Sequence, residues 1–320
     1  MKQKNFAITG VAGYIAPRHL RAIKETGNRL VAAVDPHDSV GILDSYFDGV
    51  QFFREFERFD RHVEKLRRLG EEQRVHYVSI CSPNYLHDAH ARFALRVGAD
   101  VICEKPVVLN PWNIEPLQEL EQESGKRIYT ILQLRVHPTL MDLKAKFGKE
   151  PQKTKKDIEL TYITTRGPWY LASWKGQLER SGGLATNIGI HFFDLLIWLF
   201  GPVEHSEVHL ANPIKTGGYL ELKGARVKWF LSIDKEDLPQ DCKKNNKSTH
   251  RLILLDGEKI EFSEGFTDLH TVVYKEILSG KGFGLDDALP SIVLAYDIRN
   301  AKPIGINKNS HPFLKKIKDS

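Results

Sequence analysis

Lys105 stands where an apolar strand ends in a charged pair and a proline. Residues 101–103 are Val, Ile and Cys, and Glu104, Lys105 and Pro106 follow them. Open α/β sheets bind ligands at the carboxyl ends of their strands, and proline stiffens the turn because its ring fixes φ. The position therefore suits an ammonium group that handles a proton beside a ligand. The alternative is an ordinary ion pair between Glu104 and Lys105 at the end of a strand.

A histidine lies in the apolar segment 182–200. Asn187, His191 and Asp194 are spaced i, i+4 and i+7, which predicts that they share one face of a helix. An imidazole with an ordinary pKa of about 6.5 can take up a proton near neutral pH. A lone histidine on an apolar helix is more often a satisfied core residue, so the spacing alone leaves both interpretations open.

Two cations stand among aromatic residues in the segment 163–176. Arg166 and Lys175 flank Trp169, Tyr170 and Trp174. Cationic donors recognise carboxylates and phosphates, and aromatic side chains offer an apolar wall to a ring. This composition suits an anionic ligand that also carries a base or a sugar. The alternative is a loop that packs on the face of a sheet.

The elements that must position these residues begin with a βαβ unit. The pattern predicts strands at residues 6–9 and 30–34, with a helix between them that begins near Pro17. The turn from Gly10 to Ala16 reads G-x-A-G-x-x-A, where dinucleotide-binding turns usually read G-x-G-x-x-G. Asp35 ends the second strand, where a carboxylate accepts hydrogen bonds from ribose hydroxyls and repels a 2′-phosphate. The unit therefore favours NAD over NADP; the alternative is a turn that binds no ligand.

Another strand, at residues 77–81, ends in Ser82, Pro83 and Asn84, so this loop is expected at the same sheet edge as Lys105. His87 and His90 follow at i, i+3, a spacing that a metal site could use. No third and fourth ligand lies near them in sequence, so we expect no metal.

Further elements follow from hydrophobic periodicity. Residues 52–70, including Phe52 and Phe53, predict an amphipathic helix, and residues 127–133 predict the last strand of the first sheet. From residue 157 onward, alternating runs predict an antiparallel sheet, with a hairpin turn at Asp256-Gly257. The expected strands of this sheet are 157–164, 206–210, 219–223, 225–233, 251–255 and 259–262. Its apolar face, with Val227, Trp229 and Leu231, must be covered, and we expect a partner subunit to cover it.

Composition limits the class of protein. A chain of 320 residues favours two domains. A net charge of +5, with acidic and basic residues interspersed, suits a small anionic substrate, and no nucleic-acid-binding motif is present. No apolar leader and no run of about 18 apolar residues is found, so we expect a cytoplasmic protein with no membrane association. Cys81 and Cys103 lie in apolar strands and are expected to be buried thiols.

Together, the turn at Gly10, the terminal Asp35, the Ser82 loop with His87, and Glu104-Lys105-Pro106 resemble the glucose–fructose oxidoreductase / inositol dehydrogenase (Gfo/Idh/MocA) family. The resemblance implies an α/β protein. An N-terminal Rossmann fold, a doubly wound parallel sheet, would occupy residues 1–135. A C-terminal α+β domain on an open, mostly antiparallel sheet, for substrate binding and oligomerisation, would occupy residues 136–300, and residues 301–320 would form a tail.

The resemblance also implies roles for residues. The segment 187–194 resembles the family's G-x-H-x-x-D motif, whose histidine points at the nicotinamide. Asn187 stands where an aspartate is common, and an amide cannot take a proton, so proton handling falls to His191 and Lys105. We expect His191 to be the base and Lys105 to orient and stabilise the alkoxide, with the reverse assignment open. The expected NAD contacts are Gly10, Ala12, Gly13, Tyr14, Ile15, Asp35, Ser82, Pro83, Asn84, His87, Glu104, Lys105 and Gln133.

Within this family, segments 163–176, 186–191 and 264–270 resemble the UDP-N-acetylglucosaminuronate (UDP-GlcNAcA) 3-dehydrogenases of lipopolysaccharide O-antigen biosynthesis. Such an enzyme oxidises the C3 hydroxyl of the sugar to a ketone with NAD. The resemblance implies a homo-tetramer or a dimer, and a keto acid of the 2-oxoglutarate type is a candidate acceptor for the electrons of NADH. The expected substrate contacts are Lys105, Arg166, Tyr170, Trp174, Lys175, Thr186, Asn187 and His191.

Two other classes remain open. Another sugar or inositol dehydrogenase of the family would keep Lys105 and His191 but would not need Arg166. A non-catalytic NAD-sensing regulator would be expected to lose Lys105 or His191, and both are present.

Overall fold

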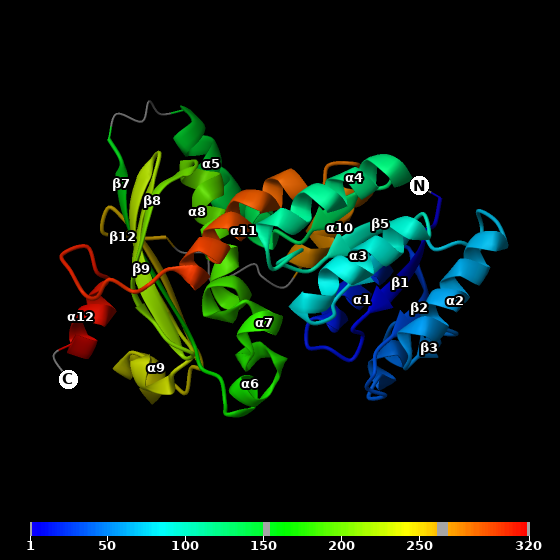
Figure 1. Cartoon of the computed structure of the whole chain (residues 1–320), viewed down its shortest axis with the longest axis horizontal. Helices are drawn as coiled ribbons and strands as arrows, with labels where there is room; N and C mark the ends of the chain where they lie inside the picture. Colours follow the sequence, from blue (N-terminus) through cyan, green and yellow to red (C-terminus); the bar gives the residue numbers. More distant parts are fainter. Residues whose placement is uncertain (1, 150–153, 261–267, 319–320) are drawn as a thin grey trace. The chain divides into compact units, whose positions relative to one another are not determined.

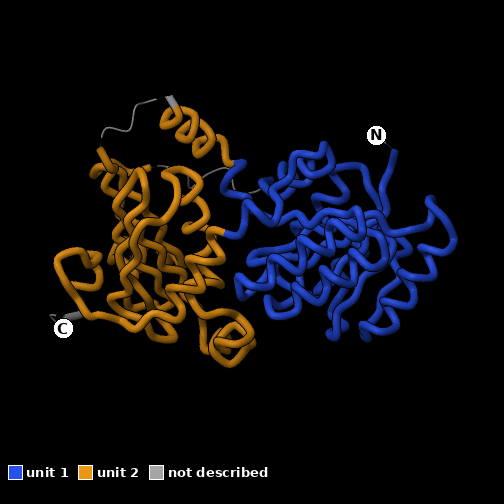
Figure 2. The backbone as a smooth tube through the Cα atoms, turned by 45° about the horizontal axis from the view of Figure 1, so that its top comes forward, with its two compact units in different colours: residues 1–136, 267–289 blue, residues 137–266, 290–320 orange. Residues whose placement is uncertain are grey.

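The structure is a computed structural model that describes residues 2–149, 154–260 and 268–318. The chain divides into two compact units (Figure 2). Unit 1 comprises Met1–Val136 and Thr267–Leu289, and unit 2 comprises His137–Phe266 and Pro290–Ser320. These limits differ from the expected domains in two places. A segment that follows the second sheet returns to unit 1, and the C-terminal residues belong to unit 2 because they pack on its sheet.

Unit 1 is built on a parallel sheet with the strand order β3-β2-β1-β4-β5-β6. This is the order of the doubly wound dinucleotide-binding fold, so the predicted fold of the first half is confirmed. The strands are β1 (Asn5–Thr9), β2 (Arg29–Val34), β3 (Gln51–Phe53), β4 (Tyr77–Ile80), β5 (Asp100–Cys103) and β6 (Ile128–Thr130). Cys81 and Cys103 are buried, as their apolar strands predicted.

Helices flank this sheet (Figure 1). They are α1 (Ala16–Glu25), α2 (Phe56–Arg68), α3 (His87–Arg96), α4 (Ile114–Ser124), α10 (Leu269–Leu278) and the start of α11 (Leu285–Asn300). The helix predicted at residues 52–70 begins later than expected. Phe52 and Phe53 pair instead with Ala33 and Val34 as β3, because an extended backbone there adds a strand to the edge of the sheet.

The last predicted strand of unit 1 is also shorter than expected. It ends at Thr130, and Gln133 begins the 3₁₀ turn η4 (Gln133–Val136). Residues 131–133 therefore leave the sheet at the carboxyl ends of its strands, where ligands bind in this fold.

Unit 2 is built on a mixed, mostly antiparallel sheet with the order β12-β11-β7-β10-β9-β8, in which β7 and β10 pair in parallel. The predicted fold class is therefore confirmed. The strands are β7 (Lys156–Thr164), β8 (Val203–Ala211), β9 (Lys215–Leu222), β10 (Ala225–Ser232), β11 (Thr249–Leu255) and β12 (Glu258–Lys259). Asp256 and Gly257 both have positive φ in the turn that joins β11 to β12, so the predicted hairpin is present.

The helices of unit 2 lie on both sides of its sheet. They are α5 (Pro138–Lys149), α6 (Trp169–Ala172), α7 (Leu178–Ser181), α8 (Ile190–Phe200), α9 (Gln240–Lys244), the part of α11 from Pro290 onward, and α12 (Pro312–Lys318). The helical stretch 178–200 is long and apolar enough to cross a membrane by length and composition alone. Because 72% of its most apolar window is buried within the protein, we interpret it as the core helix of the unit.

The protein's own chain packs on both faces of this sheet (Figure 1). On one face the Phe193 ring of α8 meets Trp229 edge to face at 5.4 Å, and Val227, Trp229 and Leu231 are all fully buried. On the other face Phe230 stacks on Phe313 of α12 at 5.4 Å. The expectation that a partner subunit covers the Trp229 face is therefore wrong, because α8 already fills it.

Candidate active site

The glycine turn and Asp35 form one hydrogen-bonded unit at the carboxyl edge of the sheet of unit 1. The Asp35 carboxylate accepts hydrogen bonds from the backbone N–H groups of Ala12 (3.0 Å) and His37 (2.9 Å). Gly10 has a φ of +75°, and a Cβ there would meet the backbone of Cys81 and Ser82 at 2.5 Å. The glycine turn can therefore approach the backbone that follows β4 only because residue 10 has no side chain.

The loop after β4 is fixed by two buried histidines. The Ser82 hydroxyl lies 2.9 Å from His90 Nδ1, which is also 3.2 Å from the Thr9 hydroxyl. Burial lowers the pKa of His90 to about 4, so the ring is neutral near pH 7. His90 therefore joins the ends of β1 and β4, which is a structural role that the i, i+3 spacing did not reveal.

His87 was predicted to contact the cofactor, and its ring is engaged elsewhere. The ring is buried, with Nδ1 2.7 Å from the carbonyl oxygen of Pro106 and Nε2 2.7 Å from that of Ser82. Burial lowers the pKa of His87, although these two hydrogen bonds oppose the shift. The imidazole thus ties the Ser82 loop to the turn that carries Lys105.

Glu104 and Lys105 differ in their surroundings. Lys105 is half-buried, whereas Glu104 is buried and its Oε1 lies 3.0 Å from the Nε2 atoms of both His19 and His270. Burial alone would raise the pKa of the Glu104 carboxyl, but the hydrogen bonds from these imidazoles outweigh it and hold the pKa well below its usual range. The hydrogen bonds to His19 and His270 are enough to explain why the Glu104 carboxylate is buried, without an ion pair to Lys105 or a contact with the cofactor.

The partners of Glu104 were not recognised from the sequence. His19 Nδ1 lies 2.7 Å from the Tyr274 hydroxyl, which lies 2.7 Å from the Ser79 hydroxyl. The only available signal was the spacing of His270 and Tyr274, which are i, i+4 on α10 and therefore share a face. Residues 264–267 of the segment that carried a resemblance lie outside the described residues.

Within the described residues, His19, Glu104 and His270 form the one group whose ligand atoms could hold a metal ion, all within 4.8 Å of one another. Hydrogen bonds at 3.0 Å account for the same geometry. The absence of a metal stays a prediction.

In unit 2 a cationic and aromatic cluster follows β7. The Lys175 ammonium lies 4.7 Å from the centre of the Trp174 ring and 5.3 Å from that of Trp169. Burial, and secondarily the positive charge of Arg166, lower the pKa of Lys175. In the described part of the chain, neither Lys175 nor Arg166 has a carboxylate within salt-bridge distance. Two neighbouring cations without an acidic partner form a local positive field that suits an anion.

Tyr170 links this cluster to the segment that carries His191. The Asn187 amide donates a hydrogen bond to the Tyr170 hydroxyl at 2.7 Å. Asn187 lies in the π-helical turn η6 (Ala185–Gly189), and regular α-helix begins only at Ile190. The predicted single α-helical face through Asn187, His191 and Asp194 is therefore interrupted, because the wider turn shifts Asn187 around the axis. π-turns inside helices occur frequently at functional sites.

Two predicted contact residues carry buried polar atoms with no hydrogen-bond partner among the residues that the structure describes. They are Gln133, through Oε1, and Thr186, through its hydroxyl. An unpaired buried polar atom is costly, so a ligand that completes the bond would remove the penalty. Tyr14 is 90% exposed at the glycine turn. The roles of all these residues as ligand contacts stay predictions.

The residues present fit a dinucleotide in unit 1. Small residues at the turn expose backbone at the N-terminus of α1, where a diphosphate is favoured. The Asp35 carboxylate stands at the end of β2, where ribose hydroxyls bind in this fold. The unpaired Gln133 Oε1 supplies a buried acceptor after β6.

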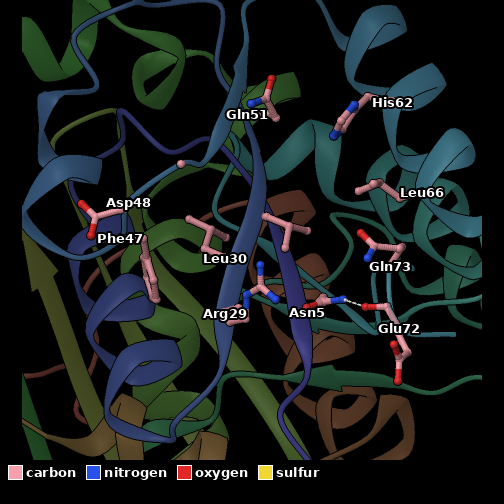
Figure 3. A pocket seen from close by; sticks show the side chains of 12 residues that line it. Asn5, Arg29, Leu30, Phe47, Asp48, Gln51, His62, Leu66, Glu72 and Gln73 are labelled. Atoms are coloured by element: carbon pink, nitrogen blue, oxygen red, sulfur yellow. Dashed lines mark hydrogen bonds between the residues drawn. The ribbon is translucent and has the colours of Figure 1, made fainter. Parts of the chain in front are cut away.

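A surface pocket of about 230 Å³ lies at the opposite edge of this sheet (Figure 3). Asn5 and Arg29, at the starts of β1 and β2, line it together with Phe47, Asp48 and Glu72. Because ligands of open α/β sheets bind at the carboxyl ends of the strands, we assign no function to this pocket.

Comparison with known proteins agrees with this geometry. Residues 4–132 match the oxidoreductase family model Gfo/Idh/MocA, NAD-binding Rossmann fold, and residues 156–237 match its C-terminal alpha/beta domain. The chain is 54% identical to the WlbA (WbpB) dehydrogenase from Thermus thermophilus, with a TM-score of 0.93 over 97% of this chain and 100% of that one. That enzyme has been solved with NAD and alpha-ketoglutarate, and with NAD and UDP-GlcNAcA.

Curated relatives are more distant. An uncharacterized oxidoreductase of Synechocystis is 27% identical over 47% of this chain and 41% of its own length. A putative UDP-kanosamine synthase oxidoreductase subunit of Amycolatopsis mediterranei is 31% identical over 40% of this chain and 36% of its own length. The chain thus matches less than half the length of these curated relatives. The two matching domain models and the full-length similarity to a solved dehydrogenase establish that the chain belongs to the Gfo/Idh/MocA family of NAD-dependent oxidoreductases.

Proposed function

We propose that this protein oxidises the C3 hydroxyl of UDP-GlcNAcA to a ketone, with NAD as the acceptor. The observation that carries the proposal is 54% identity over the whole length of a dehydrogenase whose solved complex contains NAD and UDP-GlcNAcA. A place in lipopolysaccharide O-antigen sugar biosynthesis and a cytoplasmic location are parts of the same proposal.

The reaction removes a proton from the hydroxyl oxygen and a hydride from the carbon that bears it. NAD, when bound, accepts the hydride. His191 takes the hydroxyl proton in this proposal, and the Lys105 ammonium stabilises the negative charge that develops on the oxygen; the reverse assignment uses the same two groups. A positioned general base contributes typically about 10² to 10⁴-fold to the rate.

The cationic cluster of unit 2 gives the proposal its substrate class. A uronate carboxylate or a diphosphate supplies the negative charge that Arg166 and Lys175 lack among the described residues. The Lys175 ammonium lies over the rings of Trp169 and Trp174, so an aromatic surface stands directly beside the positive charge. A neutral polyol such as inositol would leave both cations without a partner, so the cluster favours an acidic nucleotide sugar.

A keto acid is proposed to regenerate NAD. The Thermus homologue has been solved with alpha-ketoglutarate beside NAD. Reduction of such an acceptor to a hydroxy acid would consume the hydride taken from the sugar. Incubation with UDP-GlcNAcA, NAD and 2-oxoglutarate should therefore give 2-hydroxyglutarate in step with the 3-keto sugar, as measured by mass spectrometry.

Substrate discrimination tests the proposal directly. UDP-GlcNAcA and UDP-GlcNAc differ in the carboxylate, and a site that pairs a carboxylate rejects an analogue without it, so kcat/KM for UDP-GlcNAc should be at least about 100-fold lower. Equal kcat/KM values would contradict the uronate specificity. Turnover of free inositol or glucose alone would instead identify another sugar dehydrogenase.

Variants separate the roles of the residues. Lys175→Met should raise the KM for UDP-GlcNAcA by about tenfold or more and leave the Kd of NAD unchanged, because it removes one cation from the anion site. Lys302→Met, at an exposed lysine, is the matched control.

Lys105→Ala and His191→Ala should each lower kcat by orders of magnitude. Retained turnover in either variant would show that Lys105 and His191 have structural roles.

A further inference from the structure

The turn that carries Lys105 is held from inside unit 1 by a buried network of hydrogen bonds. Glu104 precedes Lys105 in the chain, and its Oε2 accepts a hydrogen bond from the Lys105 backbone N–H at 3.3 Å. Its Oε1 accepts from the Nε2 atoms of His19 and His270, both at 3.0 Å. Both carboxylate oxygens are thus occupied by donors of the protein itself.

The hydrogen-bond directions in the network follow from the protonation of Tyr274 and His19. Burial raises the pKa of Tyr274 well above its usual range, so its hydroxyl stays protonated and can donate to His19 Nδ1. Burial lowers the pKa of His19, so its ring carries one proton, which Nε2 donates to Glu104. The Ser79 hydroxyl completes the chain on the far side of Tyr274. The carboxylate is then a buried anion stabilised by three N–H donors.

The donors come from elements that are packed firmly on one another. His19 lies on α1, directly after the glycine turn, while His270 and Tyr274 lie on α10. The Thr271 hydroxyl on α10 donates to the Glu25 carboxylate on α1 at 2.8 Å. The network therefore joins the helix of the cofactor turn to the lysine turn through a segment that is distant in the chain.

We propose that Glu104 is a positioning residue for the dehydrogenase reaction, and that His19 and His270 hold its carboxylate so that the Lys105 turn keeps one geometry. The inference rests on the proposed role of Lys105 in catalysis. It assigns no ligand contact to the five residues of the network, and it explains why the chain buries the Glu104 carboxylate immediately before Lys105.

Removal of one donor tests the inference. His270→Leu keeps a side chain of similar volume but removes the N–H that His270 donates to the Glu104 carboxylate. The displaced turn should lower kcat about tenfold to 100-fold while the Kd of NAD changes less than about twofold. His270→Gln retains an N–H near the position of Nε2 and should restore most of kcat. Glu104→Gln, which places an amide against two donors, should lower kcat in the same way as His270→Leu.

His209→Leu is the matched control. His209 is a buried histidine of unit 2 that lies 2.9 Å from the Glu207 carboxylate, so the variant loses the same kind of bond in the unit that does not carry Lys105. It should reduce thermal stability without the selective fall in kcat. A second readout is the ¹⁵N NMR spectrum of labelled histidines, in which Nε2 of His19 and Nε2 of His270 should each carry a proton and their signals should shift in Glu104→Gln.

The outcomes separate this inference from the proposed function. If Lys105→Ala keeps near-full turnover, the catalytic role of Lys105 fails. If Lys105→Ala is inactive but folded His270→Leu and Glu104→Gln have normal kcat, positioning by the network is wrong while the proposed function stands. Stoichiometric zinc in the purified protein that disappears in His270→Leu would overturn the hydrogen-bonded account of the cluster.

Discussion

Asp35 shows how one carboxylate can serve the protein and a ligand at the same place. In the structure its two oxygens accept the N–H groups of Ala12 and His37, so the side chain is already fixed at the end of β2. A carboxylate has about four acceptor positions, which leaves room for ribose hydroxyls. The same fixed charge lies where NADP would carry its 2′-phosphate.

Replacement of Asp35 should therefore change cofactor choice. Asp35→Ser is expected to raise the Kd of NAD about tenfold and to reduce the preference for NAD over NADP, because it removes both an acceptor and a repelling charge. Fluorescence titration with each dinucleotide measures both values. Asp38→Ser, at an exposed carboxylate nearby, should bind NAD normally. Tighter binding of NADP than of NAD by the unaltered protein would contradict the assignment.

Glu104 and Lys105 are adjacent in the chain, but the sequence could not predict that their side chains have different surroundings. Lys105 was predicted to meet a ligand from its place at the end of a strand, and Glu104 was predicted to contact NAD from the family resemblance. The structure leaves Lys105 half-buried and turns Glu104 toward His19 and His270, which are 85 and 166 residues away in the chain. Local pattern cannot supply partners at such separations, so the direction of the Glu104 side chain could not be derived.

At the scale of elements, a glycine in a turn of unit 1 can allow backbone segments to approach one another closely. Gly10 and Gly27 have nearly the same positive φ, +75° and +74°, but a Cβ added at Gly10 would meet backbone atoms, whereas one added at Gly27 would meet nothing within 4 Å. The backbone conformation is thus strained for an L-residue at both sites, while the close approach is special to the cofactor turn.

The two glycines make a matched pair of variants. Gly27→Ala should lower the free energy of unfolding by about 1–2 kcal/mol, which is the usual cost of a left-handed conformation. Gly10→Ala should cost at least about 3 kcal/mol and weaken NAD binding, because the backbone of Cys81 or Ser82 must also move. Denaturant unfolding and NAD titration check both effects. Similar losses for the two variants would show that the contact with Cys81 is unimportant.

The C-terminal element of unit 2 introduces a pH dependence. His311, just before α12, lies 3.0 Å from the Thr161 hydroxyl, and burial lowers its pKa to about 3. The unfolded chain takes up this proton at a pKa of about 6.5, so the contribution of the neutral ring to stability is present above pH 6.5 and is lost as the pH falls toward 3.

Acid titration of stability tests this contribution. As the pH falls from 7 to 4, protonation of His311 in the unfolded chain should lower the free energy of unfolding by about 3 kcal/mol. His311→Phe removes the titrating group and keeps a ring beside Phe230, so its stability should fall less steeply over the same range. Thermal unfolding followed by circular dichroism gives the slopes. Equal slopes for the two proteins would show that the His311 proton is not linked to folding.

At the scale of the whole molecule, the fold class followed from the sequence more securely than the boundaries. Strand and helix periodicity with the turn residues predicted both sheets, and the Rossmann order is confirmed. The return of residues 267–289 to unit 1 was not predicted, because α10 and α11 have ordinary helical patterns that do not reveal which sheet they join. The cover of the second sheet was misjudged for a similar reason, since apolar strand residues look alike whether a helix or a subunit buries them.

The oligomeric state stays a prediction, and the Trp229 face no longer supports it because α8 covers that face. We expect a homo-tetramer or a dimer, with a mass four or two times the 36.5 kDa of the chain in light scattering at micromolar concentration. Mass that stays at one chain across a hundredfold range of concentration would contradict the prediction. If the oligomer forms, Trp229→Leu should not dissociate it, because that side chain is already buried within its own unit.

The discontinuous unit 1 has a consequence for biosynthesis. A ribosome makes residues 1–136 first, so the core of unit 1 at that stage lacks α10. The backbone N–H of Thr130 also cannot yet donate to the carbonyl oxygen of Phe283. At about 5–20 residues per second, the missing segment is complete roughly eight to thirty seconds later. During that interval the Glu104 carboxylate has one histidine in place of two, and the α1 surface that α10 covers stays open to chaperones. The nascent chain should thus complete its first unit only after most of its second unit has been translated.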